Sequence, residues 1–132
     1  KLIVSEQSKN LTFGNEYRSR GYNIFRDKLK FAILIDGGSA SASEILAGAL
    51  SEHGKAVLVG KKSYGKGSVQ ELVEITPQTS LKVTIAKWLT PNGHSISKAG
   101  IEPQIDVDFD VEKFKATGED NQLKRAIEEL DK

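Results

Sequence analysis

The fold of this chain is decided by the stretch Gly37-Gly38-Ser39-Ala40-Ser41-Ala42-Ser43-Glu44. An apolar run at residues 31–36 leads into it, and an amphipathic helical pattern at residues 45–50 leads out of it. Three serines therefore lie where a buried strand is predicted to turn into a helix. The start of a helix offers backbone N–H groups without partners inside the helix, and these stabilise a developing negative charge. The turn is a candidate position for a nucleophilic serine.

The composition limits the classes of function. The chain has 132 residues, enough for one domain with a buried core. Its 19 basic side chains balance 18 acidic ones, which argues against a nucleic-acid partner. With no cysteine and only two histidines, disulfides, thiolate catalysis and a metal site are not expected. No apolar run approaches the ~20 residues that span a bilayer, although membrane association of a full-length protein stays open. Because the chain begins at Lys1 rather than Met, we read it as a processed or excised piece.

Apolar periodicity predicts a strand–helix–strand unit around the serine turn. Residues 29–36 predict a buried strand, residues 41–53 a helix, and residues 56–60 a second buried strand, with Gly54 as the stop signal of the helix. A unit of this kind favours parallel pairing with a right-handed crossover. One side of the helix is expected to face the core, with Glu44, Ser51 and Glu52 facing elsewhere. The core-facing residues predicted are Ile45, Leu46, Ala49 and Leu50.

The remaining segments predict a mixed fold. Residues 69–86 alternate between apolar and polar on either side of a turn, which is typical of a β-hairpin. Residues 101–107 predict a final strand, and residues 119–130 a closing helix. Near the amino terminus, residues 2–4 predict a short strand, followed by a polar loop or loose hairpin over residues 5–21.

Several motifs have competing explanations. Ser41 and Glu44 match a capping box, a purely structural pattern, but a cap does not explain a turn made only of glycine, alanine and serine. That composition suits close approach of a ligand to the backbone. Residues 60–66 nearly match a P-loop, yet Gly67 stands where the magnesium-binding Ser or Thr belongs and the next segment alternates like a strand. Nucleotide binding is therefore not favoured.

Two further catalytic patterns are weak. Residues 63–66 imitate the Ser-x-x-Lys motif of penicillin-binding proteins, but the neighbouring glycines oppose the helical turn that this motif needs. His53 and His94 leave a Ser-His-Asp triad open in principle. His53 follows the predicted helix, where a solvated capping role is the simpler expectation.

Short segments of residues 31–107 resemble, in order and with similar gaps, the carboxy-terminal processing proteases, also called tail-specific proteases. The resemblance implies an α/β fold of the crotonase/Clp-protease-like type, here with an added β-hairpin and a C-terminal helix. Each segment alone is weak, but together and in register they are specific. They are Gly38–Ile45, Ala47–Leu50, Val59–Gly60, Tyr64–Gln70, Thr90–Ile96 and Gly100–Pro103.

The resemblance assigns catalytic roles to named positions. The nucleophile is the middle serine of Ser-Ala-Ser-Ala-Ser, here Ser41, and the base is the lysine of Gly-Lys-Gly, here Lys66. A glutamine four residues after the lysine orients it, which is Gln70 here. Some members instead show an acid eleven residues after the serine, which is Glu52 here, and both alternatives stay open.

The chemistry of such a Ser–Lys dyad follows from general principles. A serine hydroxyl is a poor nucleophile until a base takes its proton, and a lysine does so only when neutral. Burial lowers the pKa of an amine. The glycines beside Lys66 are expected to let its amine reach an apolar pocket next to Ser41. The backbone N–H of Ala42 is expected to donate to the oxyanion, and an acyl-enzyme forms on Ser41 without any metal or organic cofactor.

The resemblance also implies partners and a location. It implies polypeptide substrates recognised through their C-terminal tails and an extracytoplasmic compartment, the periplasm or cell envelope. Members carry a PDZ domain and an Asn-Pro-Gly-Gly-like segment upstream, so residues 1–132 are expected to be part of a serine protease domain with little activity alone. The alternative is a non-catalytic ligand-binding module on the same fold. The presence of both Ser41 and Lys66 argues against that alternative.

Overall fold

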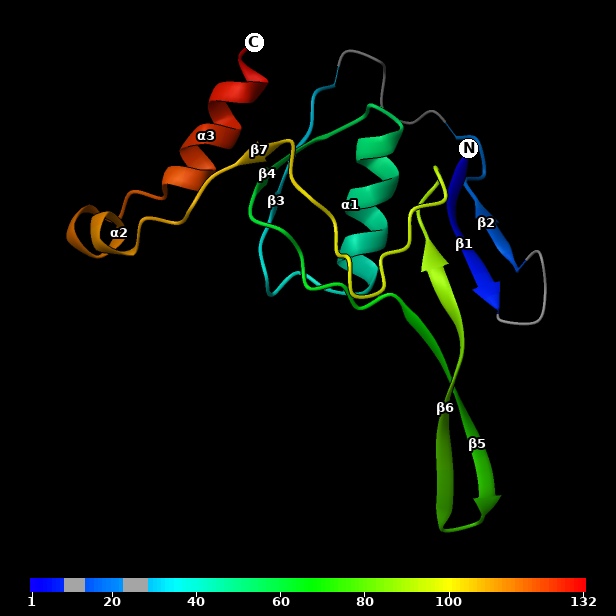
Figure 1. Cartoon of the computed structure of the whole chain (residues 1–132). Helices are drawn as coiled ribbons and strands as arrows, with labels where there is room; N and C mark the ends of the chain where they lie inside the picture. Colours follow the sequence, from blue (N-terminus) through cyan, green and yellow to red (C-terminus); the bar gives the residue numbers. More distant parts are fainter. Residues whose placement is uncertain (9–13, 23–28) are drawn as a thin grey trace.

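The computed structural model describes residues 1–8, 14–22 and 29–132 as an α/β fold with two sheets (Figure 1). The smaller sheet has the order β3-β4-β7, and both of its strand pairs are parallel, as predicted for the strands on either side of the serine turn. The strands β3 and β4 are made of apolar residues and glycine, as is typical of strands in parallel sheets. The bounds of this sheet's strands are Ala32–Ile35 (β3), Val57–Gly60 (β4) and Ile105–Asp106 (β7).

Helix α1 (Ala42–Glu52) connects β3 to β4 and packs against both β4 and strand β1 (Leu2–Ser8). Helix α3 (Asn121–Leu130) packs against β3 and β4, and Figure 1 shows the small sheet lying between the two helices. The centre of the core is formed by Ile35, Ala47 and Leu58. The start of α1 is thereby fixed next to the carboxyl end of β3.

The predicted core face of α1 is partly wrong. Leu46 is 56% exposed, whereas Glu44, which was expected to face elsewhere, is 1% exposed. Small residues, Ala47 and Gly48, take the buried positions beside Glu44. The reason is that the loop after β4 lies over the first turn of α1, and its backbone N–H groups require a buried acceptor.

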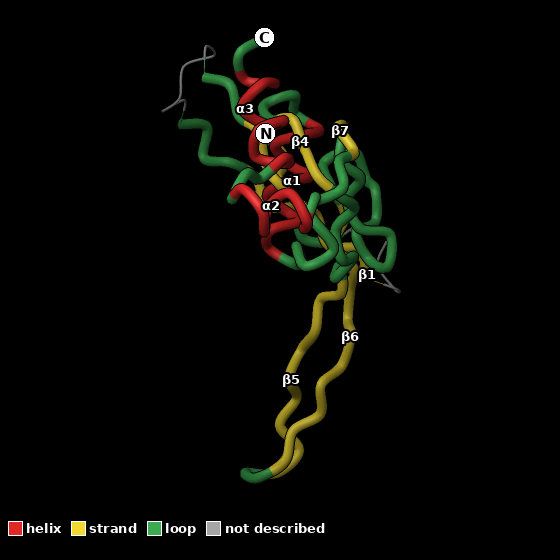
Figure 2. Tube along the Cα trace, turned by 90° about the vertical axis from the view of Figure 1, so that its left-hand side faces the viewer, coloured by secondary structure: helices red, strands yellow, loops and turns green. Residues whose placement is uncertain are grey.

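The larger sheet is antiparallel with the order β2-β1-β6-β5. The hairpin of β5 and β6 is confirmed and extends away from the rest of the described chain in both views (Figures 1 and 2). The pairing of β1 with β2 confirms a loose hairpin, although residues 9–13 lie outside the described residues. The bounds are Leu2–Ser8 (β1), Glu16–Arg18 (β2), Ser68–Thr76 (β5) and Thr79–Leu89 (β6).

The carboxyl-terminal region differs from the prediction in two places. The final strand is only β7, because Ile101 donates its N–H to Ser63 instead of to a sheet and Pro103 has no N–H to donate. A short helix, α2 (Val111–Thr117), was not predicted; it begins at the capping residue Asp110 and ends at Gly118. Helix α3 confirms the predicted closing helix. None of the described helices is long and apolar enough to cross a bilayer.

Lys61 forms ion pairs that connect the carboxyl end of β4 to the carboxyl end of β7. Its Nζ lies 2.9 Å from Asp106 and 3.0 Å from Asp108, so the residue after β4 is paired with the end of β7. Hydrogen bonds to these two carboxylates, Asp106 first, raise the pKa of Lys61. The loop that begins at Lys61 is thus held at the same edge of the sheet as the serine turn.

Candidate active site

Two loops meet at one edge of the small sheet. Because β3 and β4 are parallel, their carboxyl ends lie side by side, and the chain that follows each strand leaves from the same edge. Residues 36–41 follow β3 and residues 61–67 follow β4. The Tyr64 N–H donates to the Ser39 carbonyl at 2.9 Å, so the two loops are in direct contact.

Ser41 has a backbone conformation that is rare for a residue with a side chain. Its φ of 58° and ψ of −115° make it one of two non-glycine residues with positive φ in the described part of the chain, the other being Lys98. Such conformations cost of order 1–3 kcal/mol and concentrate at functional sites. Ser41 is also the N-cap of α1, where it forms a capping box with Glu44 and remains exposed. The turn therefore holds Ser41 at the surface of the described chain, at the start of the helix.

Ala42, the first residue of α1, leaves its backbone N–H free. Among the described residues this N–H has no hydrogen-bond partner, whereas the N–H of Ser41 donates to Glu44 and the N–H of Ser43 donates to the Ala40 carbonyl. A free donor directly after Ser41 is the arrangement expected of an oxyanion site.

Glu44 is the residue that joins the serine turn to the loop after β4. One carboxylate oxygen, Oε1, accepts from Ser63 Oγ at 2.6 Å and from the N–H of Gly65 at 2.6 Å. The other, Oε2, accepts from the N–H of Ser41 at 2.8 Å and from the N–H of Lys66 at 2.9 Å. Four donors fill the acceptor capacity of a carboxylate, which is how this side chain is buried without a cation.

The shared oxygen brings Ser41 and Lys66 together. The backbone nitrogens of both residues donate to Oε2 of Glu44. The distance between these two nitrogens therefore cannot exceed the sum of the two hydrogen-bond lengths. The two residues that the sequence proposes as a dyad thus start from neighbouring backbone positions. The capping-box interpretation of Glu44 explains only its bond to Ser41, and no sequence pattern indicates its three bonds to the second loop.

The side chain of Gln70 is hydrogen-bonded to the β5–β6 hairpin and not to this cluster. It is exposed on β5, where its Nε2 donates to Thr84 Oγ1 across the hairpin at the long distance of 3.4 Å. Lys66 is also exposed, so the expected burial of its amine in an apolar pocket is not present in the described residues. No group of three metal-ligating side chains lies in the parts of the chain that are described.

The comparisons with known proteins identify the family. Residues 1–107 match the sequence model of peptidase family S41. The chain belongs to this family. It is 56% identical over 73 residues to the carboxy-terminal processing protease CtpB of Bacillus subtilis, covering 55% of this chain and 15% of that protein. It is 46% identical over 85 residues to the chloroplastic carboxyl-terminal-processing peptidase 3 of Arabidopsis thaliana, covering 64% of this chain and 16% of that protein.

Solved structures agree with this assignment. The photosystem II D1 C-terminal processing protease superposes with a TM-score of 0.75 at 31% identity, over 81% of this chain and 27% of that chain. A lipoprotein from Streptococcus agalactiae has the same fold, with a TM-score of 0.71 at 15% identity over 99% of this chain and 45% of that one. The predicted resemblance and the α/β class are confirmed. The chain spans only about one sixth of the length of the two curated relatives above.

Ser63 is a structural residue of this S41-family site. Its buried hydroxyl donates to Glu44 and accepts from the N–H of Ile101 at 2.7 Å. A hydroxyl with both roles filled is not poised to attack a carbonyl. This agrees with the expectation that Ser63 and Lys66 do not form a penicillin-binding-protein motif.

The glycines beside Lys66 have a packing role that was not predicted. Gly65 has a φ of +89°, and a Cβ on Gly67 would lie 2.3 Å from the backbone nitrogen of Ser97. Both glycines therefore allow the loop to pack against the backbone of residues 96–100. The room that these glycines are expected to leave for the lysine side chain stays a prediction.

Gly67→Ala is expected to destabilise this loop by about 2 kcal/mol or more, since a real Cβ cannot approach backbone atoms that closely and the loop must move. Urea denaturation of the variant gives the change in the free energy of unfolding. Gly37→Ala is the matched control, because Gly37 lies in the serine turn with open space at its Cβ and should change stability by less than about 0.5 kcal/mol. Equal effects of the two changes would contradict the packing role.

Glu52 and both histidines lie at the far end of α1 from Ser41, a helix length of roughly 16 Å. Glu52 accepts from Thr90 Oγ1 at 2.7 Å, from the N–H of Asn92 at 2.7 Å and from His94 Nδ1 at 2.9 Å. His53 is the C-cap of α1, as expected, but its Nε2 bonds to the Leu2 carbonyl at 2.6 Å, so its ring is anchored to β1 instead of being solvated. The histidines have no contact with Ser41, and the Ser-His-Asp alternative has no support here.

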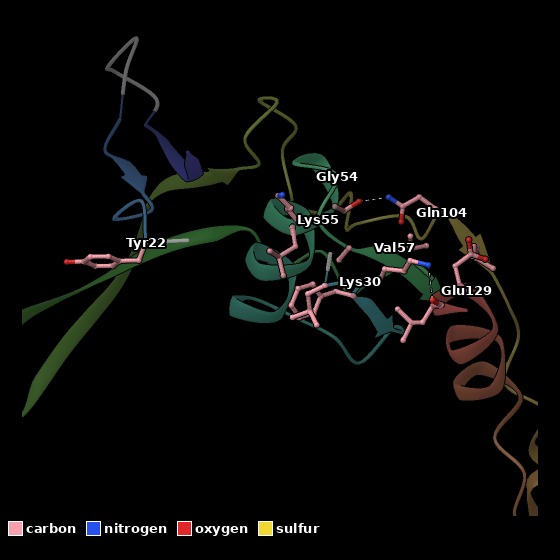
Figure 3. A pocket seen from close by; sticks show the side chains of 14 residues that line it. Tyr22, Lys30, Gly54, Lys55, Val57, Gln104 and Glu129 are labelled. Atoms are coloured by element: carbon pink, nitrogen blue, oxygen red, sulfur yellow. Dashed lines mark hydrogen bonds between the residues drawn. The ribbon is translucent and has the colours of Figure 1, made fainter. Parts of the chain in front are cut away.

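A cavity of about 710 Å³ lies beside the carboxyl end of α1, away from the serine turn (Figure 3). Its polar wall includes Gln104, which donates to Ser51 Oγ, and Lys30, which donates to the Leu130 carbonyl at 3.2 Å. Neither Ser41 nor Lys66 lines it. The cavity is a separate feature from the candidate active site.

Proposed function

We propose that the protein containing these residues is a serine endopeptidase that cleaves polypeptides near their C-terminal tails, with Ser41 as the nucleophile and Lys66 as the general base. The observation that carries this proposal is the carboxylate of Glu44, which accepts from the N–H groups of both residues. The backbone conformation of Ser41 also supports the proposal. A positive φ at a residue with a side chain costs free energy, and such conformations concentrate at functional sites.

The proposed reaction begins with a neutral Lys66 amine taking the proton of Ser41 Oγ as this oxygen attacks the scissile carbonyl. The N–H of Ala42 donates to the oxyanion, a contribution worth about 10²–10³ in rate. Lys66 then gives the proton to the leaving amine, which leaves an acyl group on Ser41. Lys66 then takes a proton from a water molecule that attacks the acyl carbon, and it returns this proton to Ser41 Oγ as the ester bond breaks, which releases the acid and restores the hydroxyl. No metal or organic cofactor takes part in these steps.

The substrate itself has a role in activating the lysine. Lys66 is exposed in the described chain, so water surrounds its amine when no substrate is bound. A polypeptide bound over the site removes water from the amine and favours its neutral form. Gln70 is proposed to orient the amine, because its long bond to Thr84 is readily exchanged for one to Lys66. An extracytoplasmic location of the full-length protein belongs to the same proposal.

Labelling by a fluorophosphonate probe tests the nucleophile. The full-length protein is expected to become labelled on Ser41, and Ser41→Ala is expected to abolish the labelling. Ser43→Ala is the matched control, because Ser43 is an exposed serine of the same turn and its loss should leave the labelling rate within about two-fold. Labelling that persists in Ser41→Ala would overturn the proposal. An unlabelled wild-type protein would favour the non-catalytic binding module.

A further inference from the structure

Strand β5 has one free edge. It is the last strand in the order β2-β1-β6-β5, and it pairs only with β6 among the described strands. It is nine residues long, and the hairpin extends from the rest of the described chain with no other element alongside it (Figures 1 and 2). A long, exposed edge of this kind offers a row of unpaired N–H and C=O groups to an incoming strand.

The free edge begins at the candidate active site. Ser68, the first residue of β5, is separated from Lys66 only by Gly67. The Gly67 carbonyl accepts from the N–H of Trp88 at 2.7 Å, so Gly67 bonds toward β6. Because antiparallel strands alternate the direction of their backbone groups, Ser68, which lies opposite Lys87, directs its N–H and C=O to the free edge.

The two faces of the hairpin differ in polarity. Val73 lies opposite Leu81, and Val83 lies on the same face opposite Glu71. These apolar side chains are between 36% and 56% exposed, and nothing in the described chain covers them. The other face is mostly polar, with Leu72 opposite Lys82 as its one large apolar residue. We call the face with Val73, Leu81 and Val83 the apolar face.

We propose that the free edge of β5 binds the polypeptide substrate as an added β-strand and leads it to Ser41 and Lys66. This inference rests on the proposed function. Added strands gain affinity from main-chain hydrogen bonds and specificity from alternate side chains. The substrate segment it selects is extended, with apolar side chains at alternate positions that continue the apolar face.

The position of this edge favours a substrate over a second copy of the chain, because the edge begins two residues after Lys66. The strand carries Glu71 and Glu74 and no basic residue. An acidic side chain of an added strand would be repelled if it lay directly opposite either glutamate. Like charges directly opposite in a sheet are destabilising. The preferred segment is therefore one without acidic residues next to Glu71 and Glu74.

The first test uses short fluorogenic peptides with free carboxyl ends. In one, valine and serine alternate; in its isomer the same residues are segregated into two blocks. The alternating peptide is expected to have a kcat/KM about ten-fold higher. N-methylation of successive amides of this peptide should lower kcat/KM about ten-fold at every second position, because only alternate N–H groups face β5. A loss that does not alternate along the peptide would overturn the inference.

The second test uses two variants of β5. Val73→Ser is expected to reduce the preference for the alternating peptide at least three-fold, whereas Leu72→Ser, on the opposite face, should leave it unchanged. Fluorophosphonate labelling of Ser41 does not need the edge and should persist in both variants. Loss of labelling in the wild-type protein would count against the proposed function instead. An equal effect of the two changes, or a dimer in sedimentation velocity that Val73→Ser dissociates, would overturn the strand-addition proposal.

Discussion

Lys66→Ala is expected to lower kcat of the full-length enzyme by roughly 10³–10⁴-fold on any peptide substrate, because among the described residues only Lys66 is proposed to take the proton of Ser41. Ser41→Ala should be at least as damaging, since it removes the atom that is proposed to form the acyl-enzyme. The double variant should be no worse than the worse of the two single variants, because residues that act as a unit are not additive. Initial rates at saturating substrate measure these effects.

Lys62→Ala is the control for Lys66→Ala. Lys62 is an exposed lysine of the same loop and pairs with Glu102 at 2.8 Å. An exposed ion pair of this kind contributes little to stability, so its loss should change kcat by less than about two-fold. A Lys66→Ala enzyme with near-normal kcat and intact folding would show that another base acts on Ser41. The dyad would then be wrong even though the family assignment stands.

The strand–helix–strand unit could be predicted from sequence because its signals are local. An apolar run, a turn of small residues and an amphipathic segment ending at Gly54 each act within a few residues. The position of Ser41 at the start of α1 follows from the same signals. The hairpin was predictable for the same reason, because its alternation and its turn lie within one continuous segment.

The burial of Glu44 was not predictable in this way. A Ser-x-x-Glu pattern predicts a cap on one helix, and its alternative partners at Ser63, Gly65 and Lys66 come from a loop that only the pairing of β3 with β4 brings near. The roles of Gly65 and Gly67 were missed for the same reason, since the backbone they contact lies some thirty residues further along the chain.

Helix α2 shows a different limit. Asp110 accepts from the N–H of Lys113 and Gly118 adopts a left-handed conformation, so both ends of the helix have the usual signals. None of its residues is buried, and it has no apolar stripe for a periodicity argument to detect. Capping residues alone are too common in sequences to predict a helix of this length.

Glu44→Gln is expected to destabilise the protein by about 2–4 kcal/mol and to lower kcat of the folded enzyme by about 10²-fold. The carboxylate accepts four hydrogen bonds, whereas an amide can accept only at its oxygen. Its NH₂ group would face two donors, either Ser63 Oγ and the Gly65 N–H or the N–H groups of Ser41 and Lys66. In either case the serine turn and the lysine loop separate, and the dyad loses its geometry.

Glu52→Gln separates this role from general stability. Glu52 accepts three hydrogen bonds at the opposite end of the same helix, so its replacement should also destabilise the protein, by about 1–3 kcal/mol. Urea denaturation gives the stabilities, and kcat is measured where both variants are folded. The folded Glu52→Gln enzyme should retain its kcat and its rate of Ser41 labelling, whereas Glu44→Gln should lose both. Equal loss of kcat in the two variants would mean that Glu44 acts only through the stability of α1, or that Glu52 orients Lys66 after all.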